Sequence, residues 1–204
     1  TMFMSDMSLN ENLSSTPQDR RELMDLVERM QGAFTTIAKS KIPTIALAHG
    51  FCIGGATSLV SACDIRLATK DAKFSIGETK LGLVADVGVI QRMPKIVSSG
   101  DMNELALTGR IFDGEYAEKI RFVSKAYENS DELFEAGEKL ANEISSNSKR
   151  IVQATKEALE KSSNLTVDQG LDYAKLWSTS FLVSEDLREG VMAFLEKRDP
   201  KFNE

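Results

Sequence analysis

Apolar side chains recur at intervals of three and four residues between positions 17 and 40, which is the spacing of one face of an α-helix. Pro17 suits the first position of such a helix, where the N–H that proline lacks would be unpaired. The apolar positions are Leu23, Leu26, Val27, Met30, Phe34 and Ile37. The opposite face mixes both charges: Arg20, Arg21, Glu22, Asp25, Glu28 and Arg29. The pattern predicts an amphipathic helix that packs on a core and turns its charged face to solvent.

The pattern then changes to short apolar runs separated by small or polar residues. Residues 42–48 are rich in β-branched side chains and predict a buried strand. Residues 56–62 predict a short buried helix, and the sequence HGFCIGG between the two runs predicts a tight turn. Residues 64–69 and 73–76 predict a strand pair with a turn between them. Alternating short strands and helices of this kind are typical of an α/β fold.

Helical spacing dominates the C-terminal part of the chain. We expect two short helices, at residues 101–108 and 113–119, and a short strand at residues 121–127. Longer helices are expected at 130–145, at 149–162, at 166–184 and after Ser184, with serine or threonine caps at their starts. We place a boundary at Asn129-Ser130, which divides the chain into a core of residues 1–129 and a helical region of residues 130–204.

Many apolar side chains of this helical region need burial that a single layer of helices cannot provide. They are Leu171, Ala174, Leu176, Trp177, Phe181, Val191, Phe194 and Leu195. Without a sheet of its own, the region must bury them against the main domain or against another subunit.

Composition and charge narrow the class of protein. The chain has 204 residues, 42% of them hydrophobic and 27% charged, as in a soluble globular domain without a membrane span. Its net charge of -6 argues against a general nucleic-acid surface. Cys52 and Cys63 lie in apolar runs without metal-ligand spacing and predict reduced core residues. With His49 as the single histidine, which we interpret as structural, a zinc site or a Ser-His triad is not expected.

The glycine-rich turn offers a place for a developing negative charge. Gly54 and Gly55 are expected just before the N-terminus of the helix at 56–62, where backbone N–H groups are unpaired and the helix dipole is positive. Because glycine has no Cβ, a ligand oxygen could approach this backbone closely. The alternative is a purely structural turn between a strand and a helix.

Two carboxylates follow the turn. Glu78 and Asp86 flank the segment KLGLVA, which is too apolar for an ordinary solvated loop. Carboxylates held near apolar walls can have raised pKa values and can exchange protons with a carbon acid. Each one taken alone is also compatible with a plain surface residue.

These motifs together resemble the crotonase superfamily of enoyl-CoA hydratases and isomerases. The matching segments are HGFCIGGATSL, CDIR, Glu78 and GLVADVGVIQRMP, with a weaker match in SEDLREGVMAFLEKRDPKF. Asp86 stands where most relatives have Gly, as in the branch of Δ3,5-Δ2,4-dienoyl-CoA isomerases. The resemblance implies a crotonase-type spiral of ββα turns with a C-terminal helical oligomerisation region that forms trimers or hexamers.

The resemblance also implies the chemistry. Gly55 N–H would hold the thioester oxygen of an acyl-CoA, and Glu78 and Asp86 would each handle one proton, near C2 and near C6, in an order that the sequence leaves open. Gly54, Ser58 and Leu83 would contact the substrate. No metal and no redox cofactor would be needed, because the thioester itself acidifies the carbon. In the family, a loop like the aperiodic N-terminal segment follows the first strands of the fold and the first oxyanion donor, so we expect those strands and that donor to be missing from this chain.

One position departs from the family pattern. Ser58 stands where hydratases have a second Glu and dienoyl isomerases an Asp, which argues against hydration. The alternatives are a Δ3,Δ2-enoyl-CoA isomerase that uses Glu78 alone, an enoyl-CoA hydratase-like protein, and a non-catalytic acyl-CoA-binding relative. We expect an intracellular protein, mitochondrial or peroxisomal if its source is eukaryotic.

Overall fold

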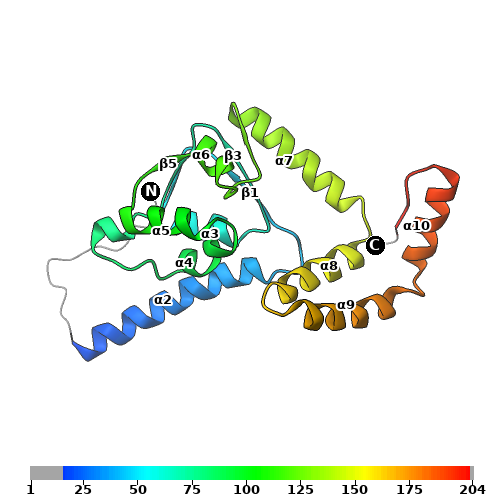
Figure 1. Cartoon of the computed structure of the whole chain (residues 1–204), viewed down its shortest axis with the longest axis horizontal. Helices are drawn as coiled ribbons and strands as arrows, with labels where there is room; N and C mark the ends of the chain where they lie inside the picture. Colours follow the sequence, from blue (N-terminus) through cyan, green and yellow to red (C-terminus); the bar gives the residue numbers. More distant parts are fainter. Residues whose placement is uncertain (1–15, 203–204) are drawn as a thin grey trace. The chain divides into compact units, whose positions relative to one another are not determined.

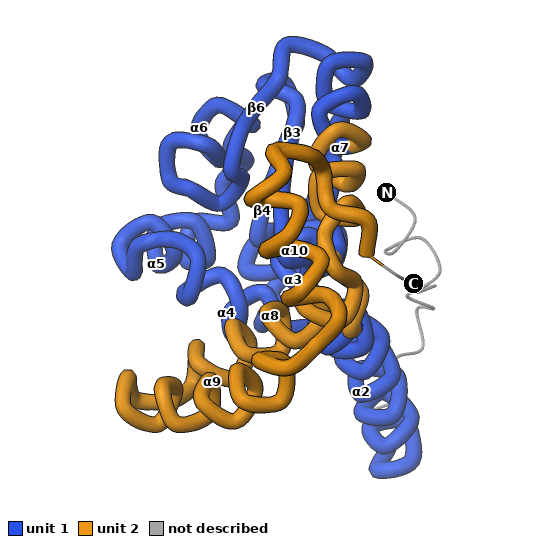
Figure 2. Tube along the Cα trace, turned by 90° about the vertical axis from the view of Figure 1, so that its right-hand side faces the viewer, with its two compact units in different colours: residues 1–40, 44–137 blue, residues 41–43, 138–204 orange. Residues whose placement is uncertain are grey.

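The computed structural model describes residues 16–202, so most of the aperiodic N-terminal segment lies outside the described residues. The chain divides into two compact units (Figure 2). The first holds residues up to 40 and residues 44–137, and the second holds residues 41–43 and residues from 138 onward. The division at Asn129-Ser130 stays a prediction.

Helix α2 (Pro17–Ala38) confirms the predicted amphipathic helix (Figure 1). Thr16 caps it by accepting a hydrogen bond from the N–H of Asp19, while the Asp19 carboxylate accepts one from Thr16 N. The helix ends two residues before the expected Ser40. Phe34 is its buried side chain and packs with Ala62 and Val87.

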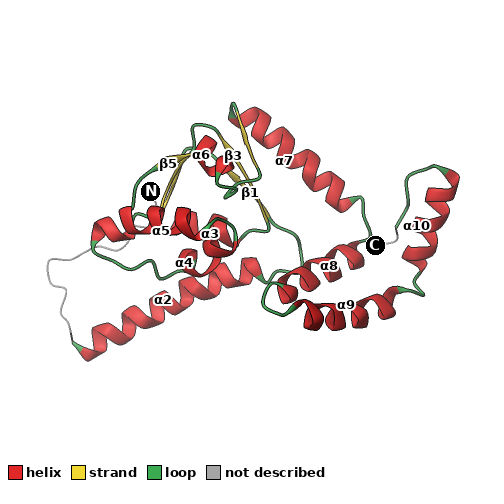
Figure 3. Cartoon of the chain, viewed as in Figure 1, coloured by secondary structure: helices red, strands yellow, loops and turns green. Residues whose placement is uncertain are grey.

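Two small sheets form the centre of the first unit (Figure 3). In one sheet β3 (Ile65–Thr69) lies between β1 (Ile45–Ala48) and β6 (Lys125–Tyr127), and all three strands are parallel. In the other, β4 (Lys73–Ser75) lies between β2 (Phe51–Ile53), which is parallel to it, and β5 (Phe112–Asp113), which is antiparallel.

The expected pairing of residues 64–69 with residues 73–76 is therefore wrong. Strands β3 and β4 follow one another but belong to different sheets, because β3 aligns with β1 and β4 aligns with β2. Gly50, with φ +64°, redirects the chain between β1 and β2, and its carbonyl accepts a bond from Lys73 N at 2.7 Å. Each strand thus pairs with its counterpart one turn earlier, which is the geometry of a spiral.

Several element boundaries also differ from expectation. The strand expected at 42–48 begins at Ile45, after Pro43, which cannot donate to a ladder. The strand expected at 121–127 begins only at Lys125, since Arg121 has φ +64° and its N–H bonds to Glu118 O in a turn. The short strands β2 and β5 were not predicted.

The helices of the first unit cover these sheets and connect them. They are α3 (Gly55–Ala62), the 3₁₀-helix η1 (Glu78–Leu81), α4 (Val89–Arg92), the 3₁₀-helix η2 (Met93–Lys95), α5 (Ser99–Thr108) and α6 (Gly114–Lys119). Helix α7 (Ser130–Ser145) then has the predicted bounds. Helix α5 begins two residues before the expected position because Ser98 caps it, and α6 begins at Gly114 because Asp113 is its cap.

Aromatic side chains anchor the core of the first unit. The ring centroid of Phe74 lies 5.5 Å from those of both Phe112 and Phe122, and all three side chains are buried. Cys52 is buried beside them, whereas Cys63 is only half-buried, and within residues 16–202 neither cysteine is part of a disulfide. His49 packs edge-on against Phe134 with centroids 5.7 Å apart, in agreement with a structural role.

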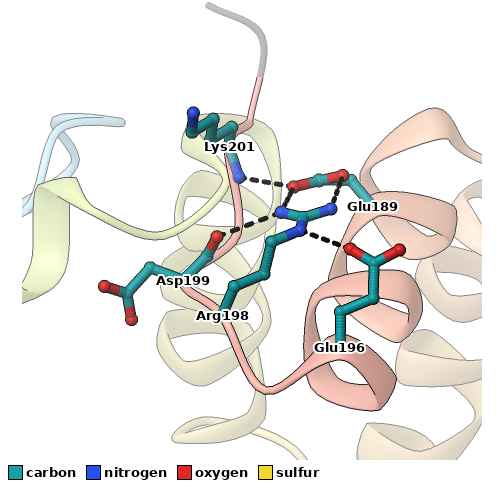
Figure 4. Close-up of polar contacts among 5 residues, drawn as sticks. All are labelled: Glu189, Glu196, Arg198, Asp199 and Lys201. Carbon is teal, nitrogen blue, oxygen red and sulfur yellow. Dashed lines mark hydrogen bonds and ion pairs between the residues drawn. The ribbon is translucent and has the colours of Figure 1, made fainter.

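The second unit is helical: α8 (Lys149–Ser162), α9 (Val167–Phe181) and α10 (Glu185–Glu196). Helix α8 has the predicted bounds, and the Thr166–Gln169 capping box of α9 is present. After α10, Arg198 forms two hydrogen bonds to the Glu189 carboxylate, at 2.6 and 3.0 Å, and one to Glu196 (Figure 4). These contacts, with a bond from Lys201 N to Glu189, fold the segment after α10 back along that helix and lower the pKa of Glu189 to about 2.

Residues 16–202 contain no helix that is long and apolar enough to cross a membrane. Within the same range, no three histidine, cysteine or carboxylate side chains gather as metal ligands would.

Candidate active site

The glycine-rich turn joins β2 to α3 and has a backbone conformation that only glycine adopts readily. Gly54 has φ +59° and ψ -119° and precedes the first residue of α3. Its N–H donates to Ser75 O at 2.9 Å, so the turn is bonded to the end of β4. Thr57 Oγ1, fully buried, lies 2.5 Å from Cys52 O and 3.0 Å from Ser75 O and links the same two strands. These bonds therefore hold the turn against β2 and β4 of the second sheet.

Gly55 is the first residue of α3, one position earlier than expected, and its N–H belongs to the group that has no partner inside the helix. A Cβ atom at Gly55 would meet no protein atom within 4 Å. The backbone at Gly55 thus borders open space, and an oxygen of a ligand can reach it there.

Glu78 lies against this turn. It opens η1, three residues after β4, and Leu83 N donates to its carbonyl at 3.0 Å. A Cβ atom at Gly54 would lie 3.4 Å from Glu78 Oε1, so the carboxylate occupies the space that the glycine leaves. The second sheet thus brings together the turn and the carboxylate, which are 24 positions apart in the sequence.

The Glu78 carboxyl group is half-buried and incompletely bonded. Its Oε2 atom is inaccessible to solvent and has no hydrogen-bond partner among residues 16–202. Burial raises the pKa of Glu78, the negative charge of Asp86 raises it further, and a bond from its own backbone N–H partly opposes both. The surroundings of Glu78 therefore favour its protonated carboxyl group more than water does. Its Oε2 atom has no hydrogen-bond partner among residues 16–202 and is the atom available to bond a substrate.

Asp86 differs from Glu78 in its surroundings. It is exposed and lies in the segment between η1 and α4, which has no regular secondary structure. Its negative charge contributes, after burial, to the raised pKa of Glu78. Between them Leu83 is 52% exposed and Val84 77%, so an apolar surface borders the pair. The sequence predicted both carboxylates and the apolar segment between them.

Ser58 lies inside α3 and is completely buried. Its N–H donates to Gly54 O at 3.1 Å, so it lies one helical turn after the glycine. The Ser58 hydroxyl has no hydrogen-bond partner within the described part of the chain. Buried polar atoms without partners are rare in native proteins, and among residues 16–202 both Ser58 Oγ and Glu78 Oε2 are atoms of this kind.

Three residues near Asp86 were not identified from the sequence as site residues. Gln31 Nε2 donates to the carbonyl of Asp86 at 2.6 Å, and Arg92 bonds both Val87 O and Thr35 Oγ1. Arg92 belongs to the QRMP motif, which could have indicated a role for it. Gln31 and Thr35 are polar residues on an amphipathic helix and carry no such signal.

Comparison with known proteins agrees with this geometry. The family model described as enoyl-CoA hydratase/isomerase matches residues 2–204. The chain belongs to the enoyl-CoA hydratase/isomerase family. The crotonase-type α/β fold inferred from the motifs is confirmed: an enoyl-CoA hydratase from Bacillus anthracis superimposes with a TM-score of 0.83 at 28% identity, covering 89% of this chain and 70% of that one. A second structure, an enoyl-CoA hydratase subunit from Geobacillus kaustophilus, superimposes with a TM-score of 0.83 at 27% sequence identity. The match covers 93% of this chain and 72% of that one.

Among named members of the family, dienoyl-CoA isomerases are similar to this chain. The mitochondrial Δ3,5-Δ2,4-dienoyl-CoA isomerase of Dictyostelium discoideum is 46% identical over 92% of this chain and 64% of its own length. The peroxisomal enzyme of that name from Arabidopsis thaliana is 41% identical over 98% of this chain and 75% of its own length. The mitochondrial mouse protein is 43% identical over 88% of this chain but only 55% of its own length. The chain thus spans less than two thirds of the Dictyostelium and mouse relatives.

Proposed function

We propose that the protein is an isomerase that converts a 3,5-dienoyl-CoA into the 2,4-dienoyl-CoA in fatty-acid β-oxidation. The observation that carries this proposal is the pair of carboxylates, with the uncommitted Glu78 Oε2 beside the Gly54 turn and Asp86 close enough to raise the pKa of Glu78. The names of relatives at 41–46% identity support the same reaction. Those names also give mitochondria and peroxisomes as the compartments that we propose for a eukaryotic source.

The two carboxylates are proposed to have different roles. The raised pKa of Glu78 suits a proton donor, so we assign the role of base to the other carboxylate, Asp86. Asp86 takes a proton from C2, the electron pair moves through the conjugated double bonds, and Glu78 gives a proton to C6. One proton leaves and one enters, so the product is an isomer. The raised pKa of Glu78 suits a group that must begin the reaction protonated.

The thioester oxygen gains negative charge when the C2 proton leaves. We propose that Gly55 N–H, at the positive end of α3 and next to open space, stabilises this charge, with Gly54 and Leu83 as neighbours of the acyl group. The thioester makes the C2 proton acidic enough for carboxylate chemistry, and the mechanism therefore assigns no step to a metal or a redox cofactor.

A spectroscopic assay of the protein on three substrates tests the proposal. The expected result is conversion of 3,5-dienoyl-CoA to the 2,4-isomer, with little or no reaction of 2-enoyl-CoA. Conversion of 3-enoyl-CoA alone would instead show the Δ3,Δ2-isomerase, the second candidate, which the exposure of Asp86 favours. Retained acyl-CoA binding without turnover of any of the three would identify a non-catalytic relative.

Ser58 offers a test of the proton-donor role. Ser58→Asp restores the carboxylate that the family resemblance implies at this position, and it is expected to raise dienoyl isomerisation at neutral pH about threefold to tenfold, because an added negative charge in the site would raise the pKa of Glu78 and keep more of it protonated. The alkaline limb of the pH–rate profile should move to higher pH. Ser58→Asn introduces a side chain of nearly the same size as aspartate but without the charge. It should leave the alkaline limb of the pH–rate profile in place. An unchanged limb in a folded Ser58→Asp protein would contradict the assignment of Glu78 as donor.

We also propose a trimer, or a hexamer made of two trimers. In the single chain the second unit exposes large apolar side chains, with Leu176 67%, Leu195 69% and Phe194 83% accessible. Exposed apolar area of this extent requires a partner. Sedimentation of the protein at micromolar concentration should therefore give a mass three or six times that of the chain, and a stable monomer would contradict the proposal.

A further inference from the structure

One face of α2 contacts the backbone that carries Asp86. Gln31 Nε2 donates to Asp86 O at 2.6 Å, across 55 positions of sequence. One turn further along the same face, Thr35 Oγ1 accepts a bond from an Arg92 guanidinium nitrogen at 3.1 Å, and the other terminal nitrogen of Arg92 donates to Val87 O at 3.3 Å. Two consecutive carbonyls, those of Asp86 and Val87, are thus connected to α2 through hydrogen bonds.

Apolar contacts and a glycine complete this connection. Phe34, between the two polar residues, is 4% exposed and packs with Val87, which is 6% exposed. Gly88 has φ +114°, a conformation that residues other than glycine rarely adopt, and a Cβ atom there would meet the Arg92 guanidinium group. The glycine thus leaves the space in which Arg92 lies, and the guanidinium group bonds to Thr35 Oγ1.

The position of Asp86 depends on these contacts with α2 more than the position of Glu78 does. Glu78 begins a 3₁₀-helix directly after β4, and its carboxylate rests against the Gly54 turn. Asp86 lies in an irregular segment, and its neighbour Val84 is largely exposed. A misplacement of about 1 Å at a reacting group can cost about a hundredfold in rate.

We propose that Gln31 and Thr35 are positioning residues for Asp86, so that α2 determines where one of the two proton carriers stands. The inference rests on the proposed function, since it gives a role to residues that hold a carboxylate of that reaction. The inference predicts that substitutions at Gln31 or Thr35 impair the proton transfer by Asp86. They should leave the positions of Gly54 and Glu78 unchanged.

The test uses nearly isosteric variants in the full chain. Gln31→Met removes the amide donor, and Thr35→Val removes the hydroxyl acceptor, while both keep the shape of the side chain. The control is Thr36→Val, because Thr36 is exposed and its Oγ1 donates to Gly32 O of its own helix. Gln31→Met and Thr35→Val are each expected to lower kcat for 3,5-dienoyl-CoA about tenfold to a hundredfold with KM nearly unchanged, and Thr36→Val to leave both constants as they are.

A double-mutant comparison separates positioning from general loosening of the fold. In an Asp86→Asn background, Gln31→Met should cause no further loss, because the group that it positions no longer carries a proton. An additional loss of tenfold in that background, or a wild-type kcat in both single variants with their melting temperatures retained, would overturn the inference. If Gln31→Met or Thr35→Val fails to fold, Gln31→Ala or Thr35→Ala replaces it and should lower kcat in the same way. Thr35→Ser keeps the hydroxyl and should retain the wild-type kcat.

Failure of this inference is distinguishable from failure of the proposed function. A wild-type protein that does not convert 3,5-dienoyl-CoA overturns both. If the wild type converts it and Asp86→Asn is impaired, while Gln31→Met and Thr35→Val behave like Thr36→Val, then only the positioning role is wrong.

Discussion

Glu78→Gln and Asp86→Asn are each expected to slow dienoyl isomerisation by about a hundredfold to ten-thousandfold, the range for loss of a general acid or base. Both amides nearly keep the size of the carboxyl group, so acyl-CoA affinity should stay similar. Neither amide can exchange a proton as a carboxyl group does. Steady-state kinetics on 3,5-dienoyl-CoA, together with a binding measurement, check this expectation.

The pH dependence identifies which carboxyl group donates. Burial and the charge of Asp86 raise the pKa of Glu78 above the ordinary value for glutamate. A donor must be protonated, so activity should fall as the pH rises through this raised pKa, and Glu78→Gln should abolish that limb. If Glu78 were the base, activity would instead fall as the pH drops through the same pKa.

The relative effects of the two substitutions distinguish a dienoyl-CoA isomerase from a Δ3,Δ2-enoyl-CoA isomerase. A Δ3,Δ2-isomerase that uses Glu78 alone should lose its activity in Glu78→Gln and keep most of it in Asp86→Asn. Full dienoyl isomerase activity in both variants would rule out the two-carboxylate mechanism, although the family and the fold would stand.

Gly55→Val is expected to lower kcat by about a hundredfold or more, which is the scale for losing one oxyanion donor. A Cβ atom at this position meets no atom from the rest of the fold within 4 Å, so a valine side chain has room to extend into the space where we propose that the thioester oxygen approaches. The glycine does not have a positive φ, so valine needs no strained backbone there. The variant should therefore fold normally and fail in catalysis.

Two further variants make this result specific. Gly55→Ala places a single methyl group in the same space and should give an intermediate loss. Gly32→Val on α2 is the control, because a Cβ atom at Gly32 also meets nothing within 4 Å and lies on an exposed residue away from the turn. An unchanged kcat in a folded Gly55→Val protein would mean that the turn is merely structural.

Local patterns in the sequence determined the long helices and indicated the residues that we propose for the site. Helices α7 and α8 have the predicted bounds, and α2 begins where Thr16 and Pro17 predict, because caps and apolar periodicity act within a few residues. Glu78, Asp86 and the Gly54–Gly55 turn were likewise recognisable, since they form motifs within a single segment of the chain.

Only the tertiary structure decided how those segments meet. The assignment of β3 and β4 to different sheets depends on pairing with β1 and β2, which no local pattern encodes. The raised pKa of Glu78 depends on burial and on a charge eight positions away. The bond from Gln31 to Asp86 joins an exposed amide to a carbonyl 55 positions further on. Such contacts arise from chain packing, so the residues that make them are indistinguishable in the sequence from ordinary surface residues.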